Sequence, residues 1–143
     1  MKVENNTPKT IVLDASAVLA YILPDERTPK HIIKVFKYWK NQKTNPFSPP
    51  LLKSEVGNTL KSSVKRKRLT PKTAQKIYNN FLKLPITYIT PNLPKTLILA
   101  IKHNLSFYDA LYLSLSLEKS TSLVTLDKKL AKLSVFGICI RYQ

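Results

Sequence analysis

Glycine is almost missing from this sequence of 143 residues, in which only Gly57 and Gly137 occur. Phosphate-binding loops of nucleotide-binding proteins need several glycines close together, because the backbone itself must approach the phosphates. Two glycines so far apart in the chain cannot form such a loop. The sequence therefore excludes the common dinucleotide-binding and P-loop nucleotide sites.

Cysteine and histidine are equally scarce. The single cysteine, Cys139, has no partner for an internal disulfide, and the two histidines, His31 and His103, are far apart. No spacing among these residues is typical of a zinc site. The sequence therefore disfavours a disulfide framework and a soft-metal cofactor.

Long apolar runs are also missing, since none approaches the roughly 18 residues that a membrane span requires. The polar start of the sequence is not a signal peptide. Apolar residues still make up 43% of the chain, which is typical of a globular protein. We expect one domain over residues 10–143 after a polar leader at residues 1–9, located in the cytoplasm without contact to a membrane.

Acidic residues are few: eight Asp and Glu stand against 24 Lys and Arg, which gives a formal net charge of +16. Such a positive field attracts polyanions, and nucleic acid is the commonest polyanion in a cytoplasm. Lysine-rich solubility is the competing interpretation of the same charge. The charge therefore indicates a class of partner and not an activity.

Short β-branched and apolar runs alternate with amphipathic segments along the chain. Strands are predicted at residues 10–13, 86–89, 122–126 and 138–142, and a turn is predicted at residues 45–50. Helices are predicted at residues 14–23, 29–42, 51–68, 70–84, 93–103, 106–119 and 128–133. Strands separated by helices predict a single-domain α/β fold of three layers, with a mostly parallel central sheet between helices.

Four of the eight acids are embedded in apolar surroundings: Asp14, Glu55, Asp109 and Asp127. Asp14 and Asp127 directly follow predicted strands, at the edge where parallel sheets bind ligands. Both also precede helices and fit helix caps, and Ser106 with Asp109 fits a capping box. Capping cannot explain Glu55, which lies mid-helix without a basic residue three or four positions away.

Carboxylates near an apolar core are costly unless they are paired or bind a cation. The basic residues of this chain cluster on helix faces and at the tip of a predicted helical hairpin, Lys65–Arg68. A hard divalent cation, Mg²⁺ or Mn²⁺, is then the natural partner of the acids, because it prefers oxygen ligands. Such a site suits the hydrolysis of phosphodiester bonds.

At this point the residues resemble a known family. The chain looks like a PIN-domain protein and is most similar to the VapC-type toxin ribonucleases of prokaryotic toxin–antitoxin pairs. Four motifs carry the resemblance: Ile11-Val-Leu-Asp14-Ala-Ser16-Ala, Pro50-Leu-Leu-Lys-Ser-Glu55-Val-Gly-Asn58, Leu105-Ser-Phe-Tyr-Asp109-Ala-Leu-Tyr and Leu123-Val-Thr125-Leu-Asp127-Lys-Lys-Leu. Each motif alone is weak, but the four in this order, over about residues 10–141, are specific.

The resemblance implies a PIN-like fold and a metal-dependent endoribonuclease that is the toxin of a toxin–antitoxin system. It implies that Asp14, Asp109 and Asp127 hold Mg²⁺ or Mn²⁺, which activates a water for attack on an RNA phosphate. Glu55 would complete the four catalytic acids, holding a metal-bound water or acting as a base. Some members carry a further acid just after the last motif aspartate, where this chain has Lys128 and Lys129, and this departure argues against a second metal position.

Polar residues beside the acids are implied to support them. The family pattern places the Ser16 and Thr125 hydroxyls next to the carboxylates, although a first-turn helix serine and a β-branched strand residue explain them nearly as well. Asn58 could orient Glu55 or a water, or be a solvated helix residue. Tyr108 and Tyr112 could stack on bases, although aromatic residues in an apolar helix usually belong to the core.

RNA is the expected substrate, and the basic residues of the predicted hairpin would bind its backbone without reading sequence. These residues are Lys61, Lys65, Arg66, Lys67, Arg68, Lys72 and Lys76. A solvated charged turn is the competing interpretation. The resemblance also implies a cognate antitoxin protein and a homodimer.

Two other functions compete with the nuclease. In a non-catalytic RNA-binding module the acids would be caps and the lysines would bind the RNA. A receiver-like phosphoacceptor domain also has an aspartate after its first strand. It needs an acidic pair near position 14, which Leu13 and Ala15 do not supply.

Overall fold

The computed structural model describes residues 9–24 and 28–134. These residues form a parallel sheet of four strands in the order β3-β2-β1-β4, which confirms the predicted α/β class. The strands are β1 (Lys9–Leu13), β2 (Thr44–Ser48), β3 (Thr87–Tyr88) and β4 (Ser122–Val124). The helices are α1 (Ala15–Ile22), α2 (Lys30–Lys40), α3 (Leu51–Lys65), α4 (Pro71–Leu82), α5 (Leu93–His103), α6 (Phe107–Glu118) and α7 (Lys128–Leu133).

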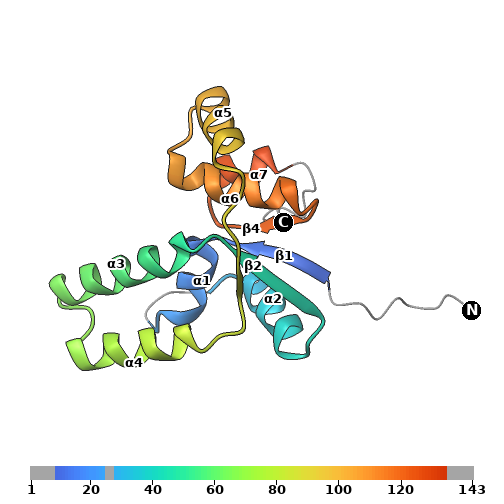
Figure 1. Ribbon diagram of the computed structural model, residues 1–143. Helices are drawn as coiled ribbons and strands as arrows, with labels where there is room; N and C mark the ends of the chain where they lie inside the picture. Colours follow the sequence, from blue (N-terminus) through green and yellow to red (C-terminus); the bar gives the residue numbers. More distant parts are fainter. Residues whose placement is uncertain (1–8, 25–27, 135–143) are drawn as a thin grey trace, which may run out of the picture.

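Helices cover both faces of the sheet (Figure 1), so that the predicted three layers are confirmed. Successive side chains of a strand point to opposite faces. Ile11 and Leu13 of β1 accordingly pack against α1, α2, α3 and α4, while Val12 between them packs against α6 and α7. Helix α5 packs on the outer side of α6. The sheet is therefore buried between two separate apolar cores.

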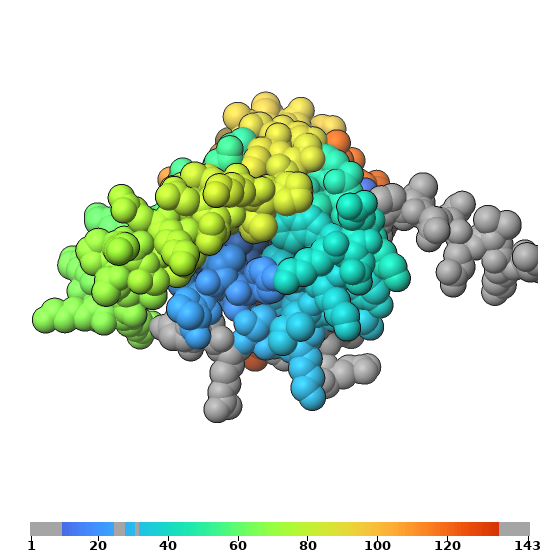
Figure 2. Space-filling model, turned by 90° about the horizontal axis from the view of Figure 1, so that it is seen from below, coloured from blue at the N-terminus to red at the C-terminus, as the bar shows by residue number. Residues whose placement is uncertain are grey.

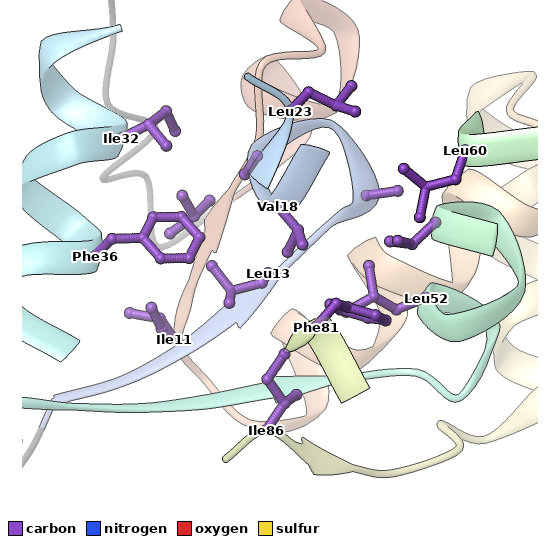
Figure 3. Packing of buried hydrophobic residues seen from close by; sticks show 14 residues of the cluster. Ile11, Leu13, Val18, Leu23, Ile32, Phe36, Leu52, Leu60, Phe81 and Ile86 are labelled. Atoms are coloured by element: carbon purple, nitrogen blue, oxygen red, sulfur yellow. The ribbon is translucent and has the colours of Figure 1, made fainter. Parts of the chain in front are cut away.

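The larger core lies on the α1 side of the sheet. Figure 3 shows Leu13 and Val18 at its centre, between Phe36 of α2 and Phe81 of α4. Figure 2, which views this side from below, shows α1 between α2 and the α3–α4 hairpin. Phe36 also stacks on Tyr21 with ring centroids 3.8 Å apart. This packing fixes α1, and with it the end of β1 that bears Asp14.

The predicted turn at residues 45–50 is wrong, because β2 occupies most of it and lies between β1 and β3. Pro46 suggests a turn, since a proline has no N–H to donate to a sheet. Peptide groups of a strand face its two neighbours in alternation. The Ser48 carbonyl faces β3, because it accepts from the Ile89 N–H at 3.0 Å. The peptide nitrogen of Pro46, two residues earlier, faces the same side. The pairing with β3 begins only at Phe47, so β3 has no residue opposite Pro46 that would need a donor there.

The helix boundaries agree with the predicted ones to within a few residues. Thr70, Asn92 and Ser106 each cap a helix by accepting a backbone N–H three residues later, at 2.9 to 3.1 Å. The predicted hairpin is confirmed, but α3 ends at Lys65, and Lys67 adopts a left-handed backbone with φ 59°. No helix in the described ranges is long and apolar enough to cross a membrane.

Two predictions fall partly or wholly outside the described residues. The strand predicted at residues 138–142 lies beyond residue 134, the last residue that the structure describes. The predicted polar leader at residues 1–9 also lies outside, except for Lys9, which begins β1 and pairs with Thr44 of β2.

Candidate active site

Two of the predicted site acids lie at the carboxyl ends of neighbouring strands. Asp14 directly follows β1 and Asp127 lies three residues after the end of β4, which pairs with β1 in parallel. The Asp14 N–H donates to the Val124 carbonyl at 3.2 Å, and the Ser48 hydroxyl of β2 donates to the Leu13 carbonyl at 2.8 Å. The edge that presents Asp14 is therefore held from both neighbouring strands.

Asp14 is a buried carboxylate, only 4% exposed, that accepts three hydrogen bonds. Its Oδ1 accepts from the Ala17 N–H at 3.0 Å, which confirms the predicted cap of α1, and from the Ser16 hydroxyl at 2.7 Å. Its Oδ2 accepts from the Thr125 hydroxyl. Capping thus accounts for one of the three donors, and two hydroxyl groups supply the others.

The Ser16 and Thr125 hydroxyls also hold the chain that follows β4. Ser16 Oγ accepts from the Leu126 N–H at 2.9 Å, and Thr125 Oγ1 accepts from the Asp127 N–H at 2.9 Å. The two hydroxyl oxygens lie 3.4 Å apart. The structure therefore brings together both hydroxyl residues and Asp14 as the sequence predicts, and joins Asp127 to them through its backbone.

Asp127 itself is exposed and caps α7, which confirms the capping interpretation of this residue. Its Oδ1 accepts from the Lys129 N–H at 2.9 Å and from the Leu130 N–H at 3.0 Å. The neighbouring Lys129 ammonium donates to the Asn104 carbonyl at the end of α5, at 2.8 Å. That lysine is therefore bound to a helix C-terminus, where a positive charge is favourable.

Glu55 lies mid-helix on α3 and has a hydrogen-bond partner that the sequence did not predict. The Tyr112 hydroxyl on α6 donates to Glu55 Oε1 at 2.7 Å, and the Tyr112 side chain is only 2% exposed. Tyr112 lies three residues after Asp109, on the same face of α6, which is the one sequence signal for its place near the acids. Asn58 is exposed, and no described residue makes a hydrogen bond with its side chain.

Electrostatics connects three of the acids. The pKa of Asp14 is raised to about 6: burial raises it most, the hydrogen bonds to the carboxylate oppose the rise, and the Glu55 charge adds to it. Burial also raises the pKa of Glu55; the Tyr112 hydrogen bond lowers it and the Asp109 charge raises it. Burial and then Glu55 raise the pKa of Tyr112, so its hydroxyl keeps its proton and stays a donor.

Removing one hydroxyl tests this account of Asp14. Thr125→Val deletes a donor to the Asp14 carboxylate, so we expect the pKa of Asp14 to rise above its wild-type value. The measurement is an NMR titration of ¹³C-labelled aspartate without metal. Thr121→Val is the matched control, because the Thr121 hydroxyl donates to the Thr10 carbonyl instead. Equal pKa values of Asp14 in both variants would contradict the assignment.

The acids do not form a closed set of metal ligands. Within residues 9–24 and 28–134, no three His, Cys, Asp or Glu side chains lie close enough to hold an ion by themselves. Their chemistry nevertheless fits Mg²⁺ or Mn²⁺, because all are carboxylates and Mg²⁺ usually keeps several waters between itself and the protein. A buried carboxylate whose pKa is raised by burial and by a neighbouring acid is also one that a cation would stabilise.

The predicted basic residues Lys61, Lys65, Arg66, Lys67 and Arg68 are all exposed, at the end of α3 and in the turn before α4. Glu55 lies on the same helix, roughly 15 Å from Lys65 along its axis at 1.5 Å per residue. The structure therefore places the basic tip of the hairpin apart from the acids but on an element that leads to them (Figure 1).

Comparison with known proteins agrees with this geometry. The PIN domain family profile matches residues 11–135. The chain is similar to ribonuclease VapC3 of Pyrobaculum aerophilum, with 29% identity over 126 residues that cover 85% of this chain and 92% of that protein. The crystal structure of PAE2754 from Pyrobaculum aerophilum has the same fold, with a TM-score of 0.72 and 22% identity over 94% of this chain and 91% of that one.

The family match includes all four predicted acids and both hydroxyl residues that hold Asp14. It also spans both cores, strands β2, β3 and β4, and β1 from Ile11 onward. The resemblance that the four motifs indicate is confirmed, and the chain belongs to the PIN domain family.

Proposed function

We propose that this chain is a divalent-metal-dependent endoribonuclease that hydrolyses RNA phosphodiester bonds as the toxin of a toxin–antitoxin pair in the cytoplasm. The observation that carries the proposal is the buried Asp14 carboxylate at the sheet edge. The Glu55 charge raises the pKa of Asp14, and the Asp109 charge raises the pKa of Glu55, so the three acids lie within electrostatic reach of one another. If the acids were only solvated surface residues or helix caps, as in the non-catalytic module, nothing would require them to lie within electrostatic reach of one another. The similarity to a protein named ribonuclease VapC3 supports RNA as the substrate.

In the proposed site Asp14, Asp109 and Asp127 would hold Mg²⁺ or Mn²⁺ together with waters, and the ion would supply Lewis-acid stabilisation of the phosphate and of the attacking water. Ser16 and Thr125 fix the Asp14 carboxylate through its two oxygens, so that its orientation is set before any ligand binds. Glu55 is the acid that accepts the proton of the water. A carboxylate whose pKa is raised is suited to this role, because it binds the proton more readily.

Cleavage of a mixed pool of structured RNA tests the function. The pool is incubated at fixed salt with Mg²⁺, with Mn²⁺, or with EDTA, and RNA binding is measured in parallel. We expect cleavage with either metal and none with EDTA. Binding without cleavage under every metal condition, repeated on total RNA from the host, would favour the non-catalytic RNA-binding module instead.

The basic tip of the α3–α4 hairpin is proposed to bind the RNA backbone. Replacing Lys65, Arg66, Lys67 and Arg68 with glutamine should weaken RNA binding at low salt. The dependence of log affinity on log salt should become shallower by roughly 0.7 for each phosphate of a single strand that the variant no longer neutralises. The measurement is RNA affinity by fluorescence anisotropy at several salt concentrations.

The control for this prediction replaces the exposed lysines of α2, Lys30, Lys34, Lys37 and Lys40, with glutamine. It removes the same net charge from another surface, so it separates a direct interaction from the general positive field. We expect a smaller decrease of affinity and a nearly unchanged salt slope. Equal effects of the two sets of substitutions would contradict a specific role for the hairpin tip.

Two protein partners complete the proposal: a cognate antitoxin and a second copy of the chain. Large apolar side chains that are at least 47% exposed gather on α5, namely Leu93, Leu97, Ile98 and Ile101. Leu93, Leu97 and Ile101 recur every fourth residue, so they form one stripe that can pair with itself about a two-fold axis. An exposed apolar stripe of this kind is typical of a protein interface.

A further inference from the structure

The hydrogen bond between Tyr112 and Glu55 joins two helices that pack in different cores, one on each face of the sheet. Glu55 lies on α3 and Tyr112 on α6, 57 positions later in the chain. Asp109 lies one turn before Tyr112 on α6. Helix α6 therefore brings one acid to the site and, from its next turn, the donor that contacts a second acid.

We propose that Tyr112 is a positioning residue, whose hydroxyl holds the Glu55 carboxylate inward beside Asp14 and Asp109. This inference rests on the proposed nuclease function, in which Glu55 accepts a proton. Glu55 is half-buried, and the Asp109 charge acts against its own. Without a donor, the Glu55 side chain would gain rotamer freedom and hydration by turning toward solvent. The hydrogen bond at 2.7 Å opposes that rotation.

A tyrosine suits this position better than a basic residue. A Lys or Arg next to Glu55 would neutralise the acid and repel a divalent cation bound nearby. The Tyr112 hydroxyl is a neutral donor, and burial raises its pKa so that it remains protonated. It can therefore orient the carboxylate without removing the negative charge of the site.

Core packing alone does not require the hydroxyl. The Tyr112 ring belongs to the core between the sheet and α6, where a phenylalanine would bury the same ring. A buried hydroxyl needs a partner, and the Tyr112 hydroxyl is 2.7 Å from an acid of the site. Asp14 is held in the same way by the hydroxyls of Ser16 and Thr125.

The test compares Tyr112→Phe with Tyr78→Phe in RNA cleavage by the full chain. Tyr78 is a matched control, because its hydroxyl donates to the Lys53 carbonyl on α3 at 2.8 Å, two residues before Glu55. We expect Tyr112→Phe to lower kcat roughly ten- to a hundredfold, the effect of one hydrogen bond to a charged group, with KM unchanged. Tyr78→Phe should keep kcat within about twofold of wild type. Wild-type kcat in Tyr112→Phe, or an equal decrease in both variants, would overturn the proposal.

A double-mutant cycle with Glu55→Ala shows whether Tyr112 acts through Glu55. When the acid is absent, Tyr112→Phe should cause no further decrease of kcat, so that the two effects are not additive. A decrease as large in the Glu55→Ala background as in wild type would overturn the assignment. Such a result would show that the Tyr112 hydroxyl affects kcat through a group other than Glu55.

An NMR measurement keeps this inference separate from the proposed function. The chain has four glutamates, so ¹³C labelling of the glutamate carboxyl carbon gives few signals, and Glu55→Gln assigns the one from Glu55. At fixed pH, that signal should shift in Tyr112→Phe and stay in place in Tyr78→Phe. If the wild type cleaves no RNA, the nuclease proposal fails while the NMR result still decides whether the hydroxyl holds Glu55. An unshifted signal in Tyr112→Phe would refute it.

Discussion

Asp14→Asn is expected to lower RNA cleavage on the order of a thousandfold or more while leaving RNA affinity within about twofold. Asparagine has the same shape and can still accept the Ala17 N–H that caps α1. It lacks the negative charge that the proposed metal site requires. The Lys and Arg residues proposed to bind the RNA backbone are unchanged, so the effect should appear in the rate of cleavage and not in binding.

Glu118→Gln is the matched control for this variant. Glu118 is exposed at the last position of α6, the end of that helix opposite Asp109, and its carboxylate accepts the Asn92 N–H. The substitution removes the same charge from the protein but none from the site, so cleavage should stay near the wild-type rate. Cleavage by Asp14→Asn at a rate similar to that of Glu118→Gln would contradict the assigned role of Asp14.

The second large effect is on stability in the absence of metal. The pKa of Asp14 is about 6 in the folded protein, against an ordinary value of 3.8. The folded state therefore binds this proton more tightly than the unfolded state, and stability falls as the pH rises from about 4 to about 6. Above this range, ionised Asp14 lowers the free energy of unfolding by about 3 kcal/mol.

Urea unfolding in EDTA at pH 4 and at pH 7.5 measures this effect. Between the two values, wild type should lose about 2.5 kcal/mol more of its free energy of unfolding than Asp14→Asn, which has no carboxyl group to ionise at this position, because the unfolded carboxyl is already partly ionised at pH 4. Saturating Mn²⁺ at pH 7.5 should then stabilise wild type and leave Asp14→Asn unaffected. Parallel changes of the two proteins with pH would contradict a raised pKa of Asp14.

Local patterns in the sequence predict much of the site. The four acids, the caps formed by Asp14 and Asp127, and the hydroxyls of Ser16 and Thr125 all belong to short motifs. Each motif is a strand end followed by a helix start, or a single helix face, and such units are determined by neighbouring residues. Their order along the chain then indicates the family.

The features that sequence reasoning missed depend on distant parts of the chain. In the sequence, the β2 segment resembles a turn because it contains Pro46. It is a strand because it pairs with β1, and because the short β3 does not reach the position opposite Pro46. The bond between Tyr112 and Glu55 joins α6 to α3, so no local pattern predicts it. Both features arise only when the tertiary fold brings remote segments together.

The central claim is that the acids at the carboxyl edge of β1 bind a divalent metal. A Mn²⁺ titration followed by electron paramagnetic resonance tests it most directly, with wild type, Asp14→Asn and Glu118→Gln measured at pH 7.5. Wild type and Glu118→Gln should share at least one saturable site that Asp14→Asn lacks. Identical binding curves for the three proteins, or no saturable site in wild type, would contradict the claim.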